Sequence, residues 1–370
     1  MNDLSGAFRK GRQLVVGEPF AALLWALLGL LLLDLFADLV TGALPVSQFA
    51  TYVLDGLTVG LVIGLAGVGL SMTYSILNFA NFAHGDYITS GAFAGWAATY
   101  VVAGFGEQEL ADLLLVGAGN SVYASDLGIN ISAKPFAIVA GILVAGVSAV
   151  ALSLAVDRYV FRPLRNEEGI IILIASVGVA LALRYGIVFV FQQNSRGLTA
   201  GGSQFAVPLL DGTIQVSYHQ VALIVIAVGL MLGVHFVLQR TKLGKAMRAM
   251  SDNKDLALIT GIPTERVVRW TWIMGGGLTG IAGYLIVLER GTLSYNFGWL
   301  LLLLIFAAVI LGGIGSVYGA IGGGIIIGLA SRVSLVWLPE ATFARPAAFL
   351  VMILILVFKP QGLFSGRATA

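Results

Sequence analysis

A stretch of 41 residues without Asp, Glu, Lys or Arg runs from Gly291 to Ser331 and limits what this chain can fold into. As a single α-helix it would be roughly 60 Å long, about twice the ~30 Å hydrocarbon core of a membrane. It must therefore fold back on itself, and a turn is expected in the glycine-rich segment 312–316. The sequence predicts two membrane-spanning helices joined by this turn.

The rest of the composition agrees with a lipid environment. Hydrophobic residues make up 58% of the chain and charged residues 11%, whereas soluble domains carry about 25% charge. The chain has no cysteine, and its three histidines lie far apart, so disulfides and metal sites built from these residues are not expected. A formal net charge of +2 gives no basic field suited to nucleic acid. We expect no cofactor in this chain and no nucleic-acid partner.

Continuous apolar runs predict an all-α polytopic transmembrane bundle of eight to ten spans. The candidate spans cover residues 20–40, 53–76, 86–104, 135–157, 169–191, 219–239, 269–288, 297–313, 318–337 and 345–358.

Lys and Arg placement predicts the orientation, because cytoplasmic loops are enriched in these residues. With ten spans and a cytoplasmic N-terminus, fifteen basic residues fall on the cytoplasmic side and four on the other, so both termini are predicted to be cytoplasmic. The expected division is an N-terminal cytoplasmic segment 1–18, an additional span with its outer loop 19–52, a membrane domain 53–364 and a cytoplasmic tail 365–370.

The cytoplasmic segment 240–268 is too structured to be a simple tether. Residues 241–250 can extend the preceding helix, with apolar side chains on one face. Residues 251–253 then offer an N-cap, and residues 255–260 form a helix of under two turns.

The residues around this short helix predict how it ends and what it needs. Gly261 can supply a left-handed stop, and Thr264 can cap the next span. Such a short helix is unstable by itself, and Leu256, Leu258 and Ile259 give it an apolar surface that requires a partner. That partner is either the membrane base of the same protein or a groove on a cytoplasmic subunit.

Asp255-Leu256-Ala257 is followed after three residues by Gly261, and further motifs lie in residues 81–86, 241–249, 312–320 and 358–364. Together these motifs resemble those of ABC-importer permeases for branched-chain amino acids, the LivH/LivM type. The first resembles the EAA-x-x-x-G pattern of their coupling loop, and the form of residues 81–86 is closer to the LivH branch. The resemblance runs from about Asp55 to Phe364, so the first predicted span lies outside it.

The resemblance implies a multi-pass permease subunit in the cell membrane of a prokaryote. Its partners would be membrane lipid, a second homologous permease subunit, two cytoplasmic ATPases and an extracytoplasmic binding protein. The cargo would be a branched-chain amino acid or a related small solute such as urea or a short amide. The residues coupled to the ATPase would be Asp255, Leu256, Ala257, Leu258, Ile259 and Gly261.

The chain itself is not expected to be an enzyme. A phosphate-binding loop requires G-x-x-x-x-G-K-[ST]; around Gly244-Lys245, Gln239 replaces the first glycine and Ala246 replaces the final Ser or Thr. ATP and Mg²⁺ are therefore expected in the partner subunits.

Polar residues between the second and third spans are candidates for a translocation path. Asn78, Asn81, His84 and Asp86 lie within nine positions of one another. They form either an interfacial turn capped by its own side chains or a broken helix lining a water-filled path.

Arg184 falls near the middle of the fifth span, where an arginine needs a partner. Asp34 and Asp38 on the first span are candidate partners. Arg184 belongs either to a structural ion pair or cavity wall, or to a site for a substrate carboxylate in the translocation path.

The glycines recur at four-residue spacing, which lets helix backbones approach closely in lipid. We expect this packing role for Gly60, Gly64, Gly276, Gly280, Gly315, Gly319, Gly323, Gly324 and Gly328.

Two other functional classes are alternatives to an ABC importer. An ion- or proton-coupled secondary transporter would need intramembrane carboxylates, for which Asp34 and Asp38 are candidates. An intramembrane enzyme would need a catalytic arrangement of side chains, and the sequence offers none with a clear spacing.

Overall fold

The computed structural model describes residues 19–114, 122–199, 201, 203–338 and 340–364. The predicted cytoplasmic segment 1–18 and tail 365–370 lie outside the described residues. The helices are α2 (Pro19–Thr41), α3 (Val46–Leu77), α4 (His84–Gly104), α5 (Leu110–Leu114), α6 (Pro135–Val156), α7 (Gly169–Phe191), α8 (Tyr218–Arg240), α9 (Lys242–Asp252), α10 (Lys254–Ile259), α11 (Thr264–Arg290), α12 (Phe297–Gly312), α13 (Val317–Val333) and α14 (Ala344–Phe358). A π-helical turn, η1 (Asp157–Phe161), follows α6, and two 3-10 turns, η2 (Ser334–Val336) and η3 (Ala341–Phe343), lie between α13 and α14.

All ten predicted spans are helices, so the prediction of an all-α polytopic bundle is confirmed. Among the described residues, seven helical stretches are long and apolar enough to cross a membrane: those containing α3, α6, α7, α8, α11, α13 and α14. The remaining predicted spans coincide with α2, with α4 and with the shorter apolar helix α12.

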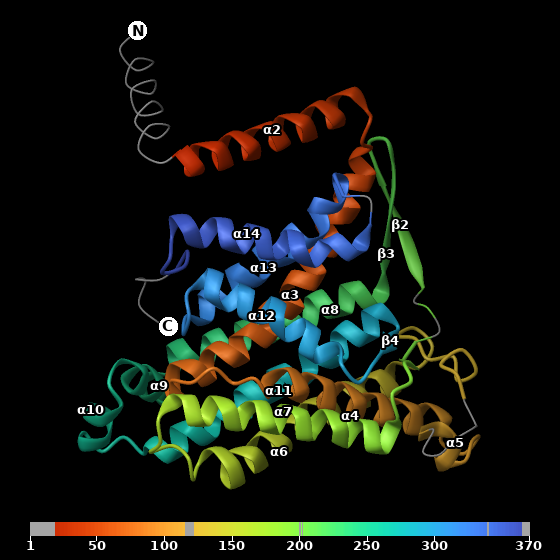
Figure 1. Cartoon of the computed structure of the whole chain (residues 1–370). Coiled ribbons are helices and arrows are strands. Elements are labelled where there is room, and N and C mark those ends of the chain that lie inside the picture. The colour runs from red at the N-terminus through yellow and green to blue at the C-terminus, as the bar shows by residue number, and fades with distance from the viewer. Residues whose placement is uncertain (1–18, 115–121, 200, 202, 339, 365–370) are drawn as a thin grey trace.

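The bundle has two distinct ends (Figure 1). At one end lie α9 and α10, together with the first turn of α2 and the last turn of α14. At the opposite end lie α5, the hairpin of β2 (Gln204–Leu209) and β3 (Gly212–Ser217), and β4 (Thr292–Leu293), which pairs with β1 (Arg196–Gly197). We call these the α10 end and the β4 end.

Close contact between α3 and α13 forms the centre of the bundle. A Cβ atom added to Gly324 would lie 2.5 Å from the Cα atom of Gly64, and one added to Gly328 would collide with the backbone of Gly56 and Gly60. Only hydrogen atoms fit between these backbones, as close approach through small residues requires. The two helices therefore pack as a tightly joined pair.

Other glycines make similar contacts elsewhere. Gly276 and Gly280 face α6, where added Cβ atoms would collide with Ser153 and with Ala145. On the side of α13 that faces α12, a Cβ atom added to Gly319 would collide with the carbonyl of Gly312, and one added to Gly323 would collide with that of Ala308.

The predicted turn between α12 and α13 is confirmed. Gly313 and Gly315 have φ values of 102° and 85°, a region that L side chains rarely adopt. The Ser316 hydroxyl caps α13 by accepting a hydrogen bond from Gly319 N at 3.0 Å. The prediction that Gly315 packs helices is wrong, since it precedes the first residue of α13 and serves the turn.

The β2–β3 hairpin was not predicted from the sequence. Its turn residue Asp211 caps α3 from a distance of more than 160 residues in sequence, because its carboxylate accepts hydrogen bonds from Val46 N and Ser47 N. These are the first two residues of α3, whose backbone N–H groups lack partners within the helix.

Candidate functional site

Capping residues define each turn of the segment between α8 and α11. Thr241 Oγ1 accepts a hydrogen bond from Gly244 N at 3.1 Å and starts α9, and Asn253 Oδ1 accepts one from Leu256 N at 2.9 Å and starts α10. Gly261, with a φ of 84°, ends α10, and Ile262 N donates a hydrogen bond of 3.0 Å to Ala257 O. The predicted short helix and its glycine stop are therefore present, with the helix beginning at Lys254.

Two details of the prediction were wrong. Residues 241–250 do not extend α8: Thr241 is extended, and the chain turns back so tightly that a Cβ at Gly244 would collide with the carbonyls of Val237 and Leu238. Thr264 does not cap α11 either, because it is the first helical residue and Pro263 occupies the N-cap position without a side-chain hydrogen bond.

Helix α10 presents an apolar surface away from the bundle. Leu256, Leu258 and Ile259 are 53%, 60% and 81% exposed, whereas Ala257 is buried against the protein. Asp255 and Gly261 are exposed as well. The bundle itself therefore leaves most of this apolar surface uncovered, and the role of these residues in ATPase coupling stays a prediction.

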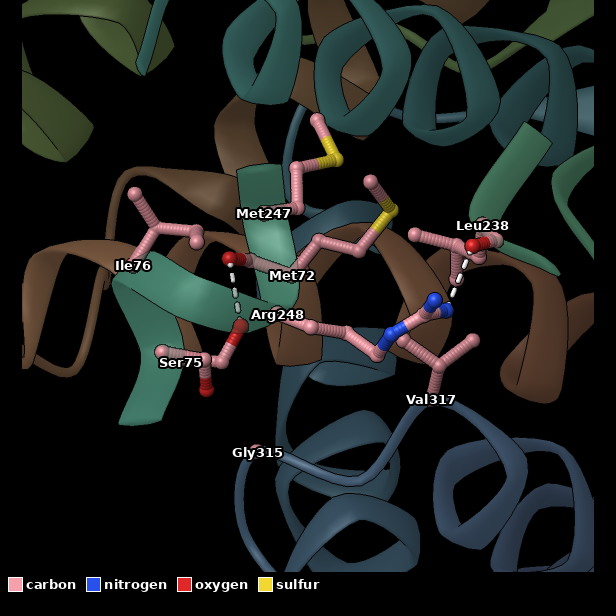
Figure 2. Close-up of a pocket in the computed structure, with 9 residues that line it drawn as sticks. Met72, Ser75, Ile76, Leu238, Met247, Arg248, Gly315 and Val317 are labelled. Atoms are coloured by element: carbon pink, nitrogen blue, oxygen red, sulfur yellow. Dashed lines mark hydrogen bonds between the residues drawn. The ribbon is translucent and has the colours of Figure 1, made fainter. Parts of the chain in front are cut away.

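A small cavity of about 30 Å³ lies where α9 meets the membrane helices (Figure 2). Its wall combines Met247 and Arg248 of α9 with Met72 and Ser75 near the end of α3. The remaining lining residues are Ile76, Leu238, Ser251, Gly315 and Val317. Arg248 Nη1 donates a hydrogen bond of 2.6 Å to Leu238 O in the last turn of α8. A displacement of α9 would thus reach α3, α8 and the turn before α13 directly.

An ion network provides a second connection, to the helix that follows α10. Arg165 binds Asp157 of η1 at 2.6 Å and Glu265 in the first turn of α11 at 2.7 Å. Both Asp157 and Arg165 are largely buried. We did not predict this network from the sequence; the only available signal was a carboxylate eight residues before an arginine at a predicted cytoplasmic boundary.

The segment between α3 and α4 contains the other polar candidates. Asn78 lies in the left-handed region with a φ of 54° and is exposed, whereas Asn81 and His84 are buried. Asn81 Oδ1 accepts a hydrogen bond from Ala83 N at 3.1 Å, so this turn is partly capped by its own side chain. His84 Nε2 lies 2.9 Å from Ala66 O and 3.2 Å from Thr279 Oγ1. The assignment of these residues to a translocation path stays a prediction.

Arg184 pairs with a residue that was not expected. Its Nη2 atom lies 3.0 Å from Oδ2 of Asp86, and its guanidinium lies 4.7 Å from the ring of Trp299. The proposed partners Asp34 and Asp38 are wrong: Asp34 on α2 instead accepts a hydrogen bond from the indole of Trp337. Asp86 therefore joins Arg184 in a buried ion pair.

Comparisons with known proteins agree with this architecture. A family model described as "Branched-chain amino acid transport system / permease component" matches residues 52–358, which leaves α2 outside it. The permease protein BraD of a high-affinity branched-chain amino acid transport system of Pseudomonas aeruginosa is 26% identical over 321 residues, covering 86% of this chain and 96% of BraD. The high-affinity branched-chain amino acid transport system permease protein LivH of Escherichia coli K12 is 27% identical over 326 residues, covering 85% of this chain and 95% of LivH.

A probable LivH of Methanocaldococcus jannaschii is 28% identical over 313 residues, covering 81% of this chain and 87% of that protein. No solved structure matches. The family match covers most of the chain, and the helices described above account for a multi-pass protein of the cell membrane. The chain belongs to the branched-chain amino acid transport permease family, and within it to the LivH type.

Proposed function

We propose that this chain is the membrane-spanning permease subunit of an ATP-driven ABC importer. It would translocate branched-chain amino acids, or a related small solute such as urea or a short amide, by alternating access. Two cytoplasmic ATPases would bind and hydrolyse ATP with Mg²⁺, a second homologous permease subunit would complete the path, and an extracytoplasmic binding protein would deliver the solute.

The observation that carries this proposal is the uncovered apolar surface of α10. A six-residue helix is too short to be stable in isolation, yet this one is capped at its start and stopped by a left-handed glycine at its end. A preformed amphipathic element suits recognition by a groove on a partner. In the proposed complex that groove belongs to the ATPase.

The structure also supplies routes from α10 into the bundle. One runs through α9 to the cavity of Figure 2, and the other runs through Glu265 at the start of α11 to Arg165. Movement of the ATPase would displace α9 and α11 together.

The competing secondary transporter receives less support. Its candidate carboxylates, Asp34 and Asp38, lie on α2, which is outside the segment that matches the family. That mechanism would also leave the uncovered surface of α10 without a role.

The test compares Leu258→Asp and Ile259→Asp with the conservative variant Ile259→Leu in a reconstituted complex of this chain with the second permease subunit, the two ATPases and the binding protein. We expect the Asp variants to lose most solute uptake and most solute-stimulated ATP hydrolysis, because a charge at a buried apolar contact is costly to desolvate. Ile259→Leu should retain both activities, and membrane insertion should be unchanged in all three. Normal uptake by both Asp variants, or accumulation of solute by the purified chain alone under an ion gradient, would contradict the proposal.

A further inference from the structure

An arginine-lined cavity lies at the end of the bundle opposite α10. The last turn of α11 contributes Arg290, the last turn of α13 contributes Arg332, and the first turn of α14 contributes Arg345. The cavity has a volume of about 390 Å³, within the ~300–1,000 Å³ typical of small-molecule sites. An adjoining space of about 170 Å³ shares Arg290, Leu304 and Arg345 with it. Strand β4 begins two residues after Arg290, which places the cavity at the β4 end (Figure 1).

The three positive charges are not balanced within the described residues. None of these guanidinium groups forms an ion pair with another described residue. The carboxylates of Glu289, which precedes Arg290 in sequence, and Asp55 repel each other, and neither residue lines either cavity. Arg290 is close enough to Arg332 and Arg345 for their charges to repel it. A bound anion would relieve this repulsion.

Helix polarity strengthens the case for an anion. Arg290 and Arg332 lie at helix C-termini, where a cation is stabilised by the helix dipole. Arg345 is the second residue of α14 and lies at the positive end of its helix, where the same dipole opposes it. Arg345 therefore gains no stabilisation from the dipole of its own helix.

The other walls of the cavity indicate what else the ligand carries. Val59 and Leu304 supply apolar surface, and Ser331 and Thr342 supply hydroxyl groups. We propose that this cavity binds the carboxylate of a small aliphatic solute through Arg290, Arg332 and Arg345, with its aliphatic part against Val59 and Leu304. Arginine is suited to this task because its planar guanidinium can bind a carboxylate through two hydrogen bonds.

This inference rests on the proposed function and sharpens it. A site built from three arginines favours an amino acid, which carries a carboxylate, over urea or a short amide, which carries none. The cavity would thus contribute to selecting the class of solute at the β4 end of the protein.

The experiment measures binding of radiolabelled L-leucine to the purified full-length chain in phosphatidylcholine nanodiscs, without ATP or ATPase. We expect Arg332→Gln and Arg345→Gln each to weaken binding by about ten-fold, the effect of removing one charge-assisted hydrogen-bonding group. Both variants should fold, because each removes one of three mutually repelling charges, and an unchanged thermal unfolding midpoint checks this. The matched control is Arg158→Gln, an exposed arginine of η1, which should leave binding unchanged.

Competition identifies the chemical group that is recognised. 4-Methylpentanoate, which has the carboxylate without the amine, should displace L-leucine, whereas leucinamide and urea should not. Equal competition by leucinamide, wild-type binding by both cavity variants, or absence of L-leucine binding would overturn the proposal.

A lipid phosphate is the other source of an anion at this position. If phosphatidylglycerol nanodiscs abolish L-leucine binding and the cavity variants lose a co-purifying anionic lipid, the cavity is a lipid site and the proposal is wrong. If binding depends on the arginines but the chain alone proves to be ion-driven, the cavity assignment stands and the ATP-driven function falls.

Discussion

Arg184 of α7 and Asp86 of α4 form an ion pair inside the bundle, with Arg184 Nη2 3.0 Å from Asp86 Oδ2 and Arg184 Nε 3.1 Å from Asp86 Oδ1. The Asp86 side chain is fully buried and that of Arg184 is 13% exposed. Few residues of α7 are buried within the chain: Ile172, Ser176, Ala180 and Ile187. This two-point contact is therefore a principal attachment of α7 to the bundle.

We predict that Asp86→Asn destabilises the protein strongly. The change leaves Arg184 without its counter-charge, and breaking a buried pair in this way costs about 3–5 kcal/mol. The measurement is the thermal unfolding midpoint in detergent. The double variant Asp86→Leu with Arg184→Met should recover part of the loss, because it removes both charges together.

The matched control for this pair is Arg162→Gln. Arg162 lies 3.5 Å from Glu265, and both side chains are 57% exposed, so this change should cost ~1 kcal/mol or less. Equal shifts for Asp86→Asn and Arg162→Gln would contradict a special role for the buried pair.

A second prediction concerns the α3–α13 contact. Gly328→Ala should lower the free energy of unfolding by about 1–3 kcal/mol, because the new methyl group has only backbone to displace. Gly229→Ala on α8 is the control, since nothing lies within 4 Å of its added Cβ atom. Thermal unfolding in the same detergent compares the two, and a similar effect of both would show that the helix pair is less tightly packed than described.

A third prediction concerns the start of α10. Asn253→Ala removes the acceptor for Leu256 N, and loss of such a cap costs about 0.5–2 kcal/mol of helix stability. We expect faster hydrogen exchange at the amides of Leu256 and Ala257, while exchange in α11 stays unchanged. Asn253→Asp, which keeps the acceptor, should retain the protection; if Asn253→Ala also retains it, the cap is not what holds α10.

A fourth prediction concerns Gly261. Because its φ is 84°, any L side chain is disfavoured there by ~1–2 kcal/mol, and a β-branched one is the worst case. Gly261→Val should raise the number of ATP molecules hydrolysed per solute imported by the reconstituted complex. Asn tolerates this conformation better, so Gly261→Asn should be milder, and an unchanged ratio for Gly261→Val would argue against a role for this turn in coupling.

A fifth prediction concerns pH and the hairpin. Partial desolvation would raise the pKa of Asp211, but hydrogen bonds from the backbone of Ser47 and Val46 to its carboxylate outweigh this and lower the pKa. A lowered pKa in the folded state means that the contact stabilises the protein above the unfolded pKa of about 3.9 and loses this effect as the pH falls through the folded value.

The measurement is proteolysis of the hairpin between pH 3 and pH 7. Cleavage of the wild type should increase at the acidic end, whereas Asp211→Asn should be cleaved readily across the range. A pH-independent difference between the two would show that ionisation of Asp211 is not responsible.

The membrane helices could be predicted from the sequence because the free energy of inserting a span depends on its own hydrophobicity. The ends of α10 could be predicted for a similar reason: Asn253 and Gly261 act on backbone within a few residues. The structure of these elements depends mainly on residues that are close in sequence, so it could be predicted.

Pairings across the bundle could not be predicted in this way. Arg184 and Asp86 are 98 positions apart, and the charge of Arg184 shows only that a partner is needed. Asp211-Gly212 is a recognised hairpin turn signal that our prediction missed, but nothing in the sequence indicates that the Asp211 carboxylate contacts the start of α3, more than 160 positions away. Likewise, Arg290, Arg332 and Arg345 come together only because α11, α13 and α14 place their ends around one cavity.

The joined pair of α3 and α13 has a geometric consequence. Met72 of α3 and Val317 of α13 line the cavity under α9, while Val59 and Arg332 of the same two helices line the arginine cavity. Because the backbones of α3 and α13 are in direct contact between the two cavities, we expect the two helices to tilt as one rigid body. A displacement of α9 would then move their opposite ends at the arginine cavity, so that widening of one cavity would accompany narrowing of the other.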